Sequence, residues 1–198
     1  MTTVDQPGTL RERKKLRTRA ALADTAVILF SERGFDNTPL DALLEVVEVS
    51  RRTFFRNYRS KEDVALTAVT HLWNEFLVVF DESEQSGPLT ELFRDTMLTT
   101  LDRMDDSWYQ RFPRTLELVD QSPALNGHTL RHCAQMRSEI TRRLTAPDSL
   151  ELRLVLEFCV ATWRCALEEW HAPHTPEDLR EATRRAFAAM DTSLRLRV

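Results

Sequence analysis

The chain has 198 residues, of which 42% are hydrophobic and 29% charged, and its formal net charge is −4. This balance is typical of a compact protein of one or two domains, and it excludes disorder over most of the chain. No apolar run is longer than the one at residues 76–80, which has far fewer than the roughly 18 residues that a membrane-spanning helix needs.

Apolar residues recur at helical spacing in the N-terminal third. Steps of four and three predict a helix from about residue 9 or 17 to residue 33, ended by Gly34, with the stripe Leu16, Ala20, Ala23, Val27 and Phe30. Thr38, before a first-turn proline, is expected to cap a short helix that ends near residue 47. Ser50 is expected to cap a second short helix, and Ser60 a longer one that continues through residue 76.

Cap and proline signals continue along the rest of the chain. Gly87-Pro88, Ser122-Pro123 and Thr175-Pro176 each precede a further helix. The count is about nine helices, with no strand and no repeat. The sequence therefore predicts an all-α protein.

The two short helices have the features of a DNA-reading helix-turn-helix. They are joined by a tight turn, and the second carries its polar residues near its start: Ser50, Arg51, Arg52, Thr53 and Arg56. The major groove accepts one helix, and an arginine there can hydrogen-bond a guanine edge at two atoms. Residues 1–61 carry a formal charge of +4 and the remainder −8, which indicates that this end meets a polyanion.

Residues 19–64 resemble the TetR family of one-component repressors. The matching features, in chain order, are Ala20-Ala21, Leu29-Phe30, Glu32, Gly34-Phe35, the Thr38-Pro39-Leu40-Asp41 helix start, the segment from Val49 to Phe55, and Ser60-Lys61-Glu62. The rest of the chain is similar to the family only in its helical content and its length.

The resemblance implies roles for single residues in DNA binding. It implies phosphate contacts for Thr53 and Lys61, and base or phosphate contacts for Ser50, Arg51 and Arg52. Further DNA contacts are expected from Thr38, Phe55, Arg56, Asn57 and Tyr58, and from the basic arm that contains Arg11, Arg13, Lys14 and Arg17. Glu48 departs from the glycine common in the family's turn, and Phe55 lacks the hydroxyl of the common tyrosine.

The domain organisation that follows is a disordered tail at residues 1–8, a helix-turn-helix domain at 9–62, and a helical effector-binding and dimerisation domain at 63–198. A repressor that reads two half-sites about 34–36 Å apart needs a two-fold interface. The last two long helices are the candidates for it, through Val155, Cys159, Thr162, Ala166, Ala182, Ala186, Ala189 and Met190. The alternative is that these faces belong to the core of a single chain.

A ligand pocket is expected among the middle helices, for a small and largely apolar molecule. Its candidate lining is mostly aromatic or sulfur-containing, with two polar groups: Met104, Trp108, Tyr109, Phe112, His128, Arg131, Met136, Phe158 and Trp163. Aromatic residues at helical spacing are more often core, and this alternative stays open.

We therefore expect a homodimeric, sequence-specific regulator, most simply a repressor, that binds a palindromic operator and releases it when the ligand binds. No cofactor or metal site is expected, because His128, His132 and Cys133 lack an evident further ligand. Three cysteines without a CxxC pair and a polar, basic N-terminus without a signal sequence indicate a cytoplasmic protein. The alternatives are a helical ligand-binding protein or enzyme, and a DNA binder with little sequence preference.

Overall fold

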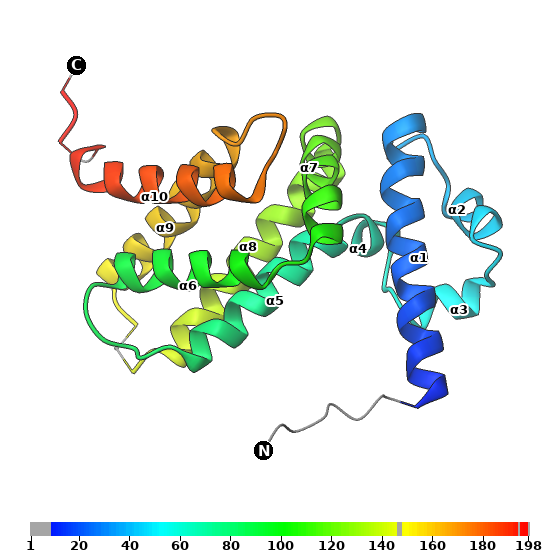
Figure 1. The fold of residues 1–198 in the computed structure, drawn as a ribbon, viewed down its shortest axis with the longest axis horizontal. Helices are drawn as coiled ribbons and strands as arrows, with labels where there is room; N and C mark the ends of the chain where they lie inside the picture. Colours follow the sequence, from blue (N-terminus) through cyan, green and yellow to red (C-terminus); the bar gives the residue numbers. More distant parts are fainter. Residues whose placement is uncertain (1–8, 146–147, 194, 198) are drawn as a thin grey trace. The chain divides into compact units, whose positions relative to one another are not determined.

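The computed structural model describes residues 9–145, 148–193 and 195–197. The tail expected at residues 1–8 lies outside them. The described residues form ten helices and no strand (Figure 1), which confirms the all-α class and comes close to the expected nine. The helices are α1 Leu10–Arg33, α2 Leu40–Val46, α3 Arg51–Phe55, α4 Lys61–Ala65, α5 Thr67–Glu82, α6 Leu89–Arg103, α7 Asp106–Gln121, α8 Pro123–Arg143, α9 Leu150–Glu168 and α10 Pro176–Ser193.

The helices group into two compact units. One contains Met1–Thr67 and Arg114–Asn126, and the other contains Ala68–Pro113 and Gly127–Val198. Helices α7 and α8 each contribute to both units, because the division falls within them. None of the helices in the described part of the chain is long and apolar enough to cross a membrane.

The first unit is built around the C-terminal half of α1. Its buried residues begin only at Leu22 and end at Phe30, whose ring packs edge-on against Phe35 at 5.2 Å. The expected stripe is therefore wrong for Leu16, which is 66% exposed, and for Ala20, which is also exposed. The physical reason is that α1 extends N-terminally beyond the part of the helix that packs against α2 and α4.

Side-chain caps fix the starts of most of these short elements. Ser50 and Ser60 accept hydrogen bonds from the N–H groups of Thr53 and Asp63, both at 3.2 Å, as expected. The expectation for Thr38 is wrong, because its hydroxyl donates to the carbonyl of Gly34 at 2.7 Å and Pro39 takes the N-cap position without a side-chain bond.

The helix expected from Ser60 through residue 76 is interrupted. Leu66, with φ −93° and ψ 18°, separates α4 from α5. The Thr67 hydroxyl donates to the carbonyl of Val64 at 2.7 Å and so satisfies one of the backbone acceptors that the break leaves. Hydrophobic spacing continues across this point, so a single interrupting residue leaves no signal in the apolar pattern.

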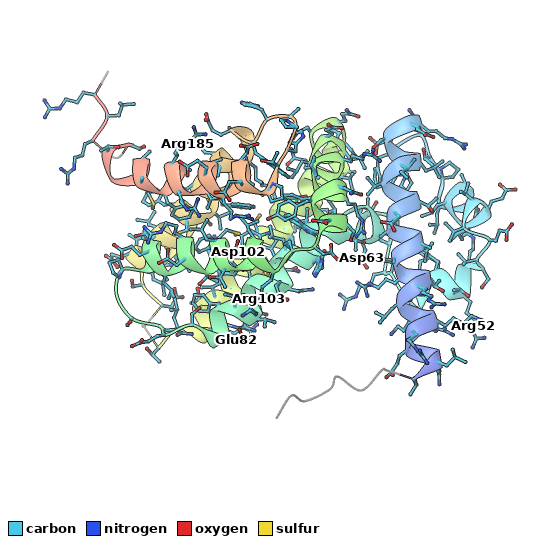
Figure 2. All side chains as sticks on the ribbon, in the orientation of Figure 1. Arg52, Asp63, Glu82, Asp102, Arg103 and Arg185 are labelled. Atoms are coloured by element: carbon cyan, nitrogen blue, oxygen red, sulfur yellow. The ribbon has the colours of Figure 1, made fainter. Side chains whose placement is uncertain are left out.

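The second unit has a core of aromatic side chains and a layer formed by α6, α9 and α10, which contact one another. The rings of Phe76 and Phe93 lie 4.8 Å apart, and Phe187 of α10 stacks on Phe93 at 5.9 Å. On its surface, Arg103 forms ion pairs with Glu75 at 3.2 Å and with Glu82 at 2.5 Å, so α6 and α5 are linked on the outside as well as in the core. Arg103 and Glu82 are labelled in Figure 2.

Candidate nucleic-acid interface

The turn between α2 and α3 has the geometry of a tight helix-turn-helix. Val47 ends α2 in a right-handed conformation, Glu48 adopts φ 55°, and the N–H of Val49 donates to the carbonyl of Leu44 at 3.0 Å. Glu48 thus occupies the left-handed region in which a glycine would carry no steric cost. The chain keeps the turn with a residue that is strained there.

The start of α3 is tightly held. The Ser50 hydroxyl oxygen lies 3.0 Å from that of Thr53, in addition to accepting the N–H of Thr53. Phe54 is fully buried, and its ring packs against Tyr58 at 5.9 Å and edge-on against Phe55 at 5.3 Å. One side of α3 is therefore fixed in the core, which determines which side chains face outward.

The outward side of α3 is basic and carries one aromatic ring. Arg51, Arg52 and Arg56 are exposed, and Phe55 is 54% exposed; Arg52 can be followed on α3 in Figure 2. Arg51 Nη2 donates to Asp41 Oδ2 of α2 at 2.5 Å, and this hydrogen bond raises the pKa of Arg51 above its ordinary value. These residues are the ones that a groove-binding helix would bring to base edges.

Three residues expected to touch DNA have intramolecular partners here. Thr38 is buried and bonded to Gly34, as described above. The side-chain amide of Asn57 donates to the carbonyl of Thr53 at 2.7 Å, and the Tyr58 hydroxyl donates to the carbonyl of Arg19 at 2.9 Å. These side chains hold α3 against its surroundings, so their expected DNA contacts stay predictions.

Lys61 also has partners inside the unit. Its ammonium donates to the carbonyls of Phe35 at 2.7 Å and Thr38 at 3.0 Å, and it lies 4.1 Å from the centre of the Phe35 ring. Lys61 therefore ties α4 to the segment that precedes α2. The phosphate contact expected of Lys61 stays a prediction beside this structural role.

The exposed half of α1 carries a dense group of cations. Thr9 caps the helix in a reciprocal capping box with Glu12, and six basic residues follow within three turns, all exposed: Arg11, Arg13, Lys14, Lys15, Arg17 and Arg19. The structure gives this segment helical form, so its cations project from a fixed backbone.

The candidate pocket residues of the second unit do not form one group. Trp108 stacks on Phe112 at 4.3 Å and meets Tyr109 edge-on at 4.9 Å. Trp170, which was not among the residues expected from the sequence, packs against both Phe112 and Tyr109. Met104, Met136 and Trp163 are buried. His128 and Arg131 pair through Nδ1 and Nη2 at 3.2 Å, and Phe158 is 37% exposed on another surface.

That other surface is an open groove of about 520 Å³ between α9 and α10. Phe158 and Cys165 line it, together with five of the eight candidate interface residues: Thr162, Ala182, Ala186, Ala189 and Met190. Val155 is half-buried, whereas Cys159 and Ala166 are fully buried within the protomer. The groove joins most of the residues expected at a subunit interface.

Comparisons with known proteins agree with this geometry. Residues 22–68 match the family model described as bacterial regulatory proteins of the tetR family, and residues 87–195 match the MftR C-terminal domain. The HTH-type transcriptional regulator TcmR of Streptomyces glaucescens is 30% identical over 98% of this chain and 89% of its own. The negative transcriptional regulator of the biofilm operon icaADBC, IcaR of Staphylococcus epidermidis, is 32% identical over 28% of this chain and 30% of its own.

The same fold is found among solved structures. Salmonella enterica GusR superposes with a TM-score of 0.57 over 91% of this chain and 97% of its own, at 15% sequence identity. At that identity the likeness concerns the fold alone.

Proposed function

This chain belongs to the TetR family of bacterial regulatory proteins, which are DNA-binding transcriptional regulators and not enzymes, and from that premise we propose that it is a homodimeric repressor. It binds a palindromic operator in the cytoplasm and releases it when a small, largely apolar ligand binds. The observation that carries the proposal is the outward side of α3, which presents arginines and one aromatic ring beside a capped, tightly packed helix start.

The proposed DNA contacts divide into base readers and phosphate contacts. Arg51 and Arg52 are suited to guanine edges, because they are exposed at the start of α3 and each can donate two parallel hydrogen bonds. Phe55 is suited to a thymine methyl group. Ser50, Thr53, Arg56 and the cations of α1 are suited to phosphate oxygens, which fix the position of the protein but carry little sequence information.

The proposed dimer uses the groove between α9 and α10. Leu150, Leu154 and Phe158 follow each other at four-residue steps on α9, and they are 60%, 45% and 37% exposed. A second copy would cover this apolar stripe, while the small residues of α10 allow a close approach of helices. Cys159 and Ala166, buried within the protomer, would support the interface from inside.

Repression and ligand release rest on separate observations. IcaR is described as a negative transcriptional regulator, and its similarity covers 28% of this chain. The aromatic cluster of Trp108, Tyr109 and Phe112 is apolar but buried and closely packed, so a ligand that contacts it must first separate these rings. A ligand releases the operator only if its affinity differs between the DNA-bound and the released geometry of the dimer.

The test is to incubate the purified protein with fragments of the source genome and sequence what it retains. We expect enrichment of a few fragments that share an inverted repeat. Arg52→Ala should retain the fold and bind that repeat roughly tenfold more weakly, with a smaller effect on random DNA. Retention of all fragments alike, with a specificity ratio near one at physiological salt, would overturn the proposal.

A further inference from the structure

The reading helix contains one arginine that is held by a carboxylate. Arg51 Nη2 donates to Asp41 Oδ2 at 2.5 Å, from α3 across to the first turn of α2. Both side chains are 62% exposed. Among the described residues, neither Arg52 nor Arg56 has an acid within ion-pair distance, so this contact distinguishes Arg51 from its neighbours.

Stability does not account for the contact. Ion pairs between exposed side chains contribute little to folding, because solvent screens them and both long side chains lose conformational freedom. The reduced conformational freedom of the Arg51 side chain can nevertheless favour DNA binding. A free arginine must be ordered when it binds a base, whereas Arg51 is already partly ordered before DNA arrives.

The geometry leaves Arg51 able to bind a base. The bond to Asp41 occupies a single N–H of the guanidinium, and the remaining N–H groups are available for O6 and N7 of a guanine. Arg51 also lies one helical turn before the exposed ring of Phe55, on the outward side of α3. A carboxylate bonded to one N–H thus restricts the guanidinium and leaves its other donors free.

The same carboxylate has a cost for DNA affinity. A negative charge at the start of α2 repels the phosphates of any duplex that α3 enters, whatever its sequence. Asp41 should therefore weaken binding to all DNA slightly and strengthen the discrimination between bases. A general charge effect would change the affinity for all DNA alike, whereas a positioning role changes the discrimination between bases, so the two roles can be told apart by experiment.

We propose that Asp41 is a positioning residue that orients Arg51 toward a guanine in each operator half-site and so sets sequence specificity at that base pair. The proposal rests on the proposed function, because it needs a protein that reads DNA. It adds a residue outside the reading helix whose effect acts through Arg51.

The experiment selects binding sites from a random-sequence duplex library with the full-length protein, its Asp41→Asn variant and its Glu45→Gln variant. Glu45 lies one turn after Asp41 on α2 and is exposed, so Glu45→Gln removes the same charge while the bond between Asp41 and Arg51 stays in place. Affinities are then measured for the selected site, for the site with one guanine replaced by adenine, and for random DNA.

We expect the wild-type protein to prefer guanine at one position in each half-site. Asp41→Asn should reduce that preference by roughly fivefold to tenfold and bind random DNA no more weakly than the wild type. Glu45→Gln should keep the preference. In the Arg51→Ala variant, the further change Asp41→Asn should have no effect on base preference. In the protein with Arg51 intact, Asp41→Glu keeps a carboxylate at this position and should keep part of the guanine preference that Asp41→Asn loses.

Two results would overturn the inference while leaving the proposed function intact. One is an unchanged guanine preference in Asp41→Asn, and the other is the same reduction of preference in the Arg51→Ala background. If the wild-type protein selects no sequence at all, the proposed function fails first and the inference fails with it. Thermal unfolding of each variant checks that a reduced preference does not come from a loss of fold.

Discussion

The backbone at Glu48 is strained, because φ is 55° in the turn between α2 and α3 and this angle brings Cβ too close to the backbone carbonyl oxygen. A left-handed conformation costs a non-glycine residue about 1–2 kcal/mol in the folded state. A glycine avoids this cost, but it raises the conformational entropy of the unfolded chain and so lowers stability by about 0.4–1 kcal/mol. Glu48→Gly should therefore raise the free energy of unfolding by roughly 0.5–1 kcal/mol, measured by urea denaturation. Glu45→Gly is the matched control: it lies in the last turn of α2, in helical conformation, and should lower the same quantity by up to about 1 kcal/mol.

Lys61 is expected to matter for stability before it matters for DNA. Its ammonium donates to two backbone carbonyls and lies over the ring of Phe35. Lys61→Met should lower the free energy of unfolding by about 2–3 kcal/mol, because neither carbonyl then has its charged donor. Lys14→Met, at an exposed position of α1, should leave it nearly unchanged.

A phosphate contact by Lys61 would show itself in a different quantity. If Lys61 contacts a phosphate, its loss in Lys61→Met should reduce the slope of log affinity against log salt by about one. The reduction should be equal on operator and random DNA. An unfolding free energy equal to that of the wild type would contradict the structural role.

At the scale of the element, the buried residues of α1 all lie in its C-terminal part, from Leu22 onward, and its N-terminal part is mostly exposed. Its exposed half carries Arg13, Lys14 and Arg17 on a capped helix. If these cations lie along the DNA backbone, changing all three to Gln should reduce the salt slope by up to about 0.9 for each phosphate that is no longer neutralised. The affinity should fall on operator and random DNA alike, as measured by titration at several salt concentrations.

The control for that charge change lies in the second unit. Arg131, Arg142 and Arg153 are exposed there, so changing them to Gln removes the same number of positive charges. An equal reduction of slope in the two triple variants would mean that net charge, and not the position of α1, explains the effect.

At the scale of the whole molecule, the groove between α9 and α10 should decide the oligomeric state. Phe158→Asp places a charge at the end of the apolar stripe that lines the groove, and burying an unpaired carboxylate is strongly unfavourable. We expect a monomer in sedimentation experiments and a large reduction of operator affinity, because one monomer reads only one half-site. Leu130→Asp, at an exposed leucine of α8 outside the groove, should remain a dimer.

Cysteine labelling gives a second measurement of the same interface. Cys165 is exposed and lines the groove, whereas burial raises the pKa of the Cys159 thiol to about 12 and also raises the pKa of Cys133. Because the thiolate is the reactive form, alkylation near pH 8 should occur mainly at Cys165. It should be slow in the dimer and faster in Phe158→Asp; equal rates would place the interface elsewhere.

The sequence by itself determined the local parts of this protein. Serine caps before short helices identified the starts of α3 and α4, and the order of small motifs from Ala20 to Glu62 identified the family, because these signals depend on neighbouring residues only. The departure at Glu48 was visible for the same reason: the family's turn commonly has a glycine at this position, where φ is 55°.

Only the tertiary structure decided what each side chain touches. Spacing could not distinguish the buried Phe30 from the exposed Leu16, because both lie on the same predicted stripe and only the extent of the neighbouring helices separates them. Asp41 and Arg51, ten residues apart, meet because the turn folds α3 back toward α2. Lys61 turned inward, and Phe158 outward, because burial depends on the elements packed around a residue, which local periodicity does not specify.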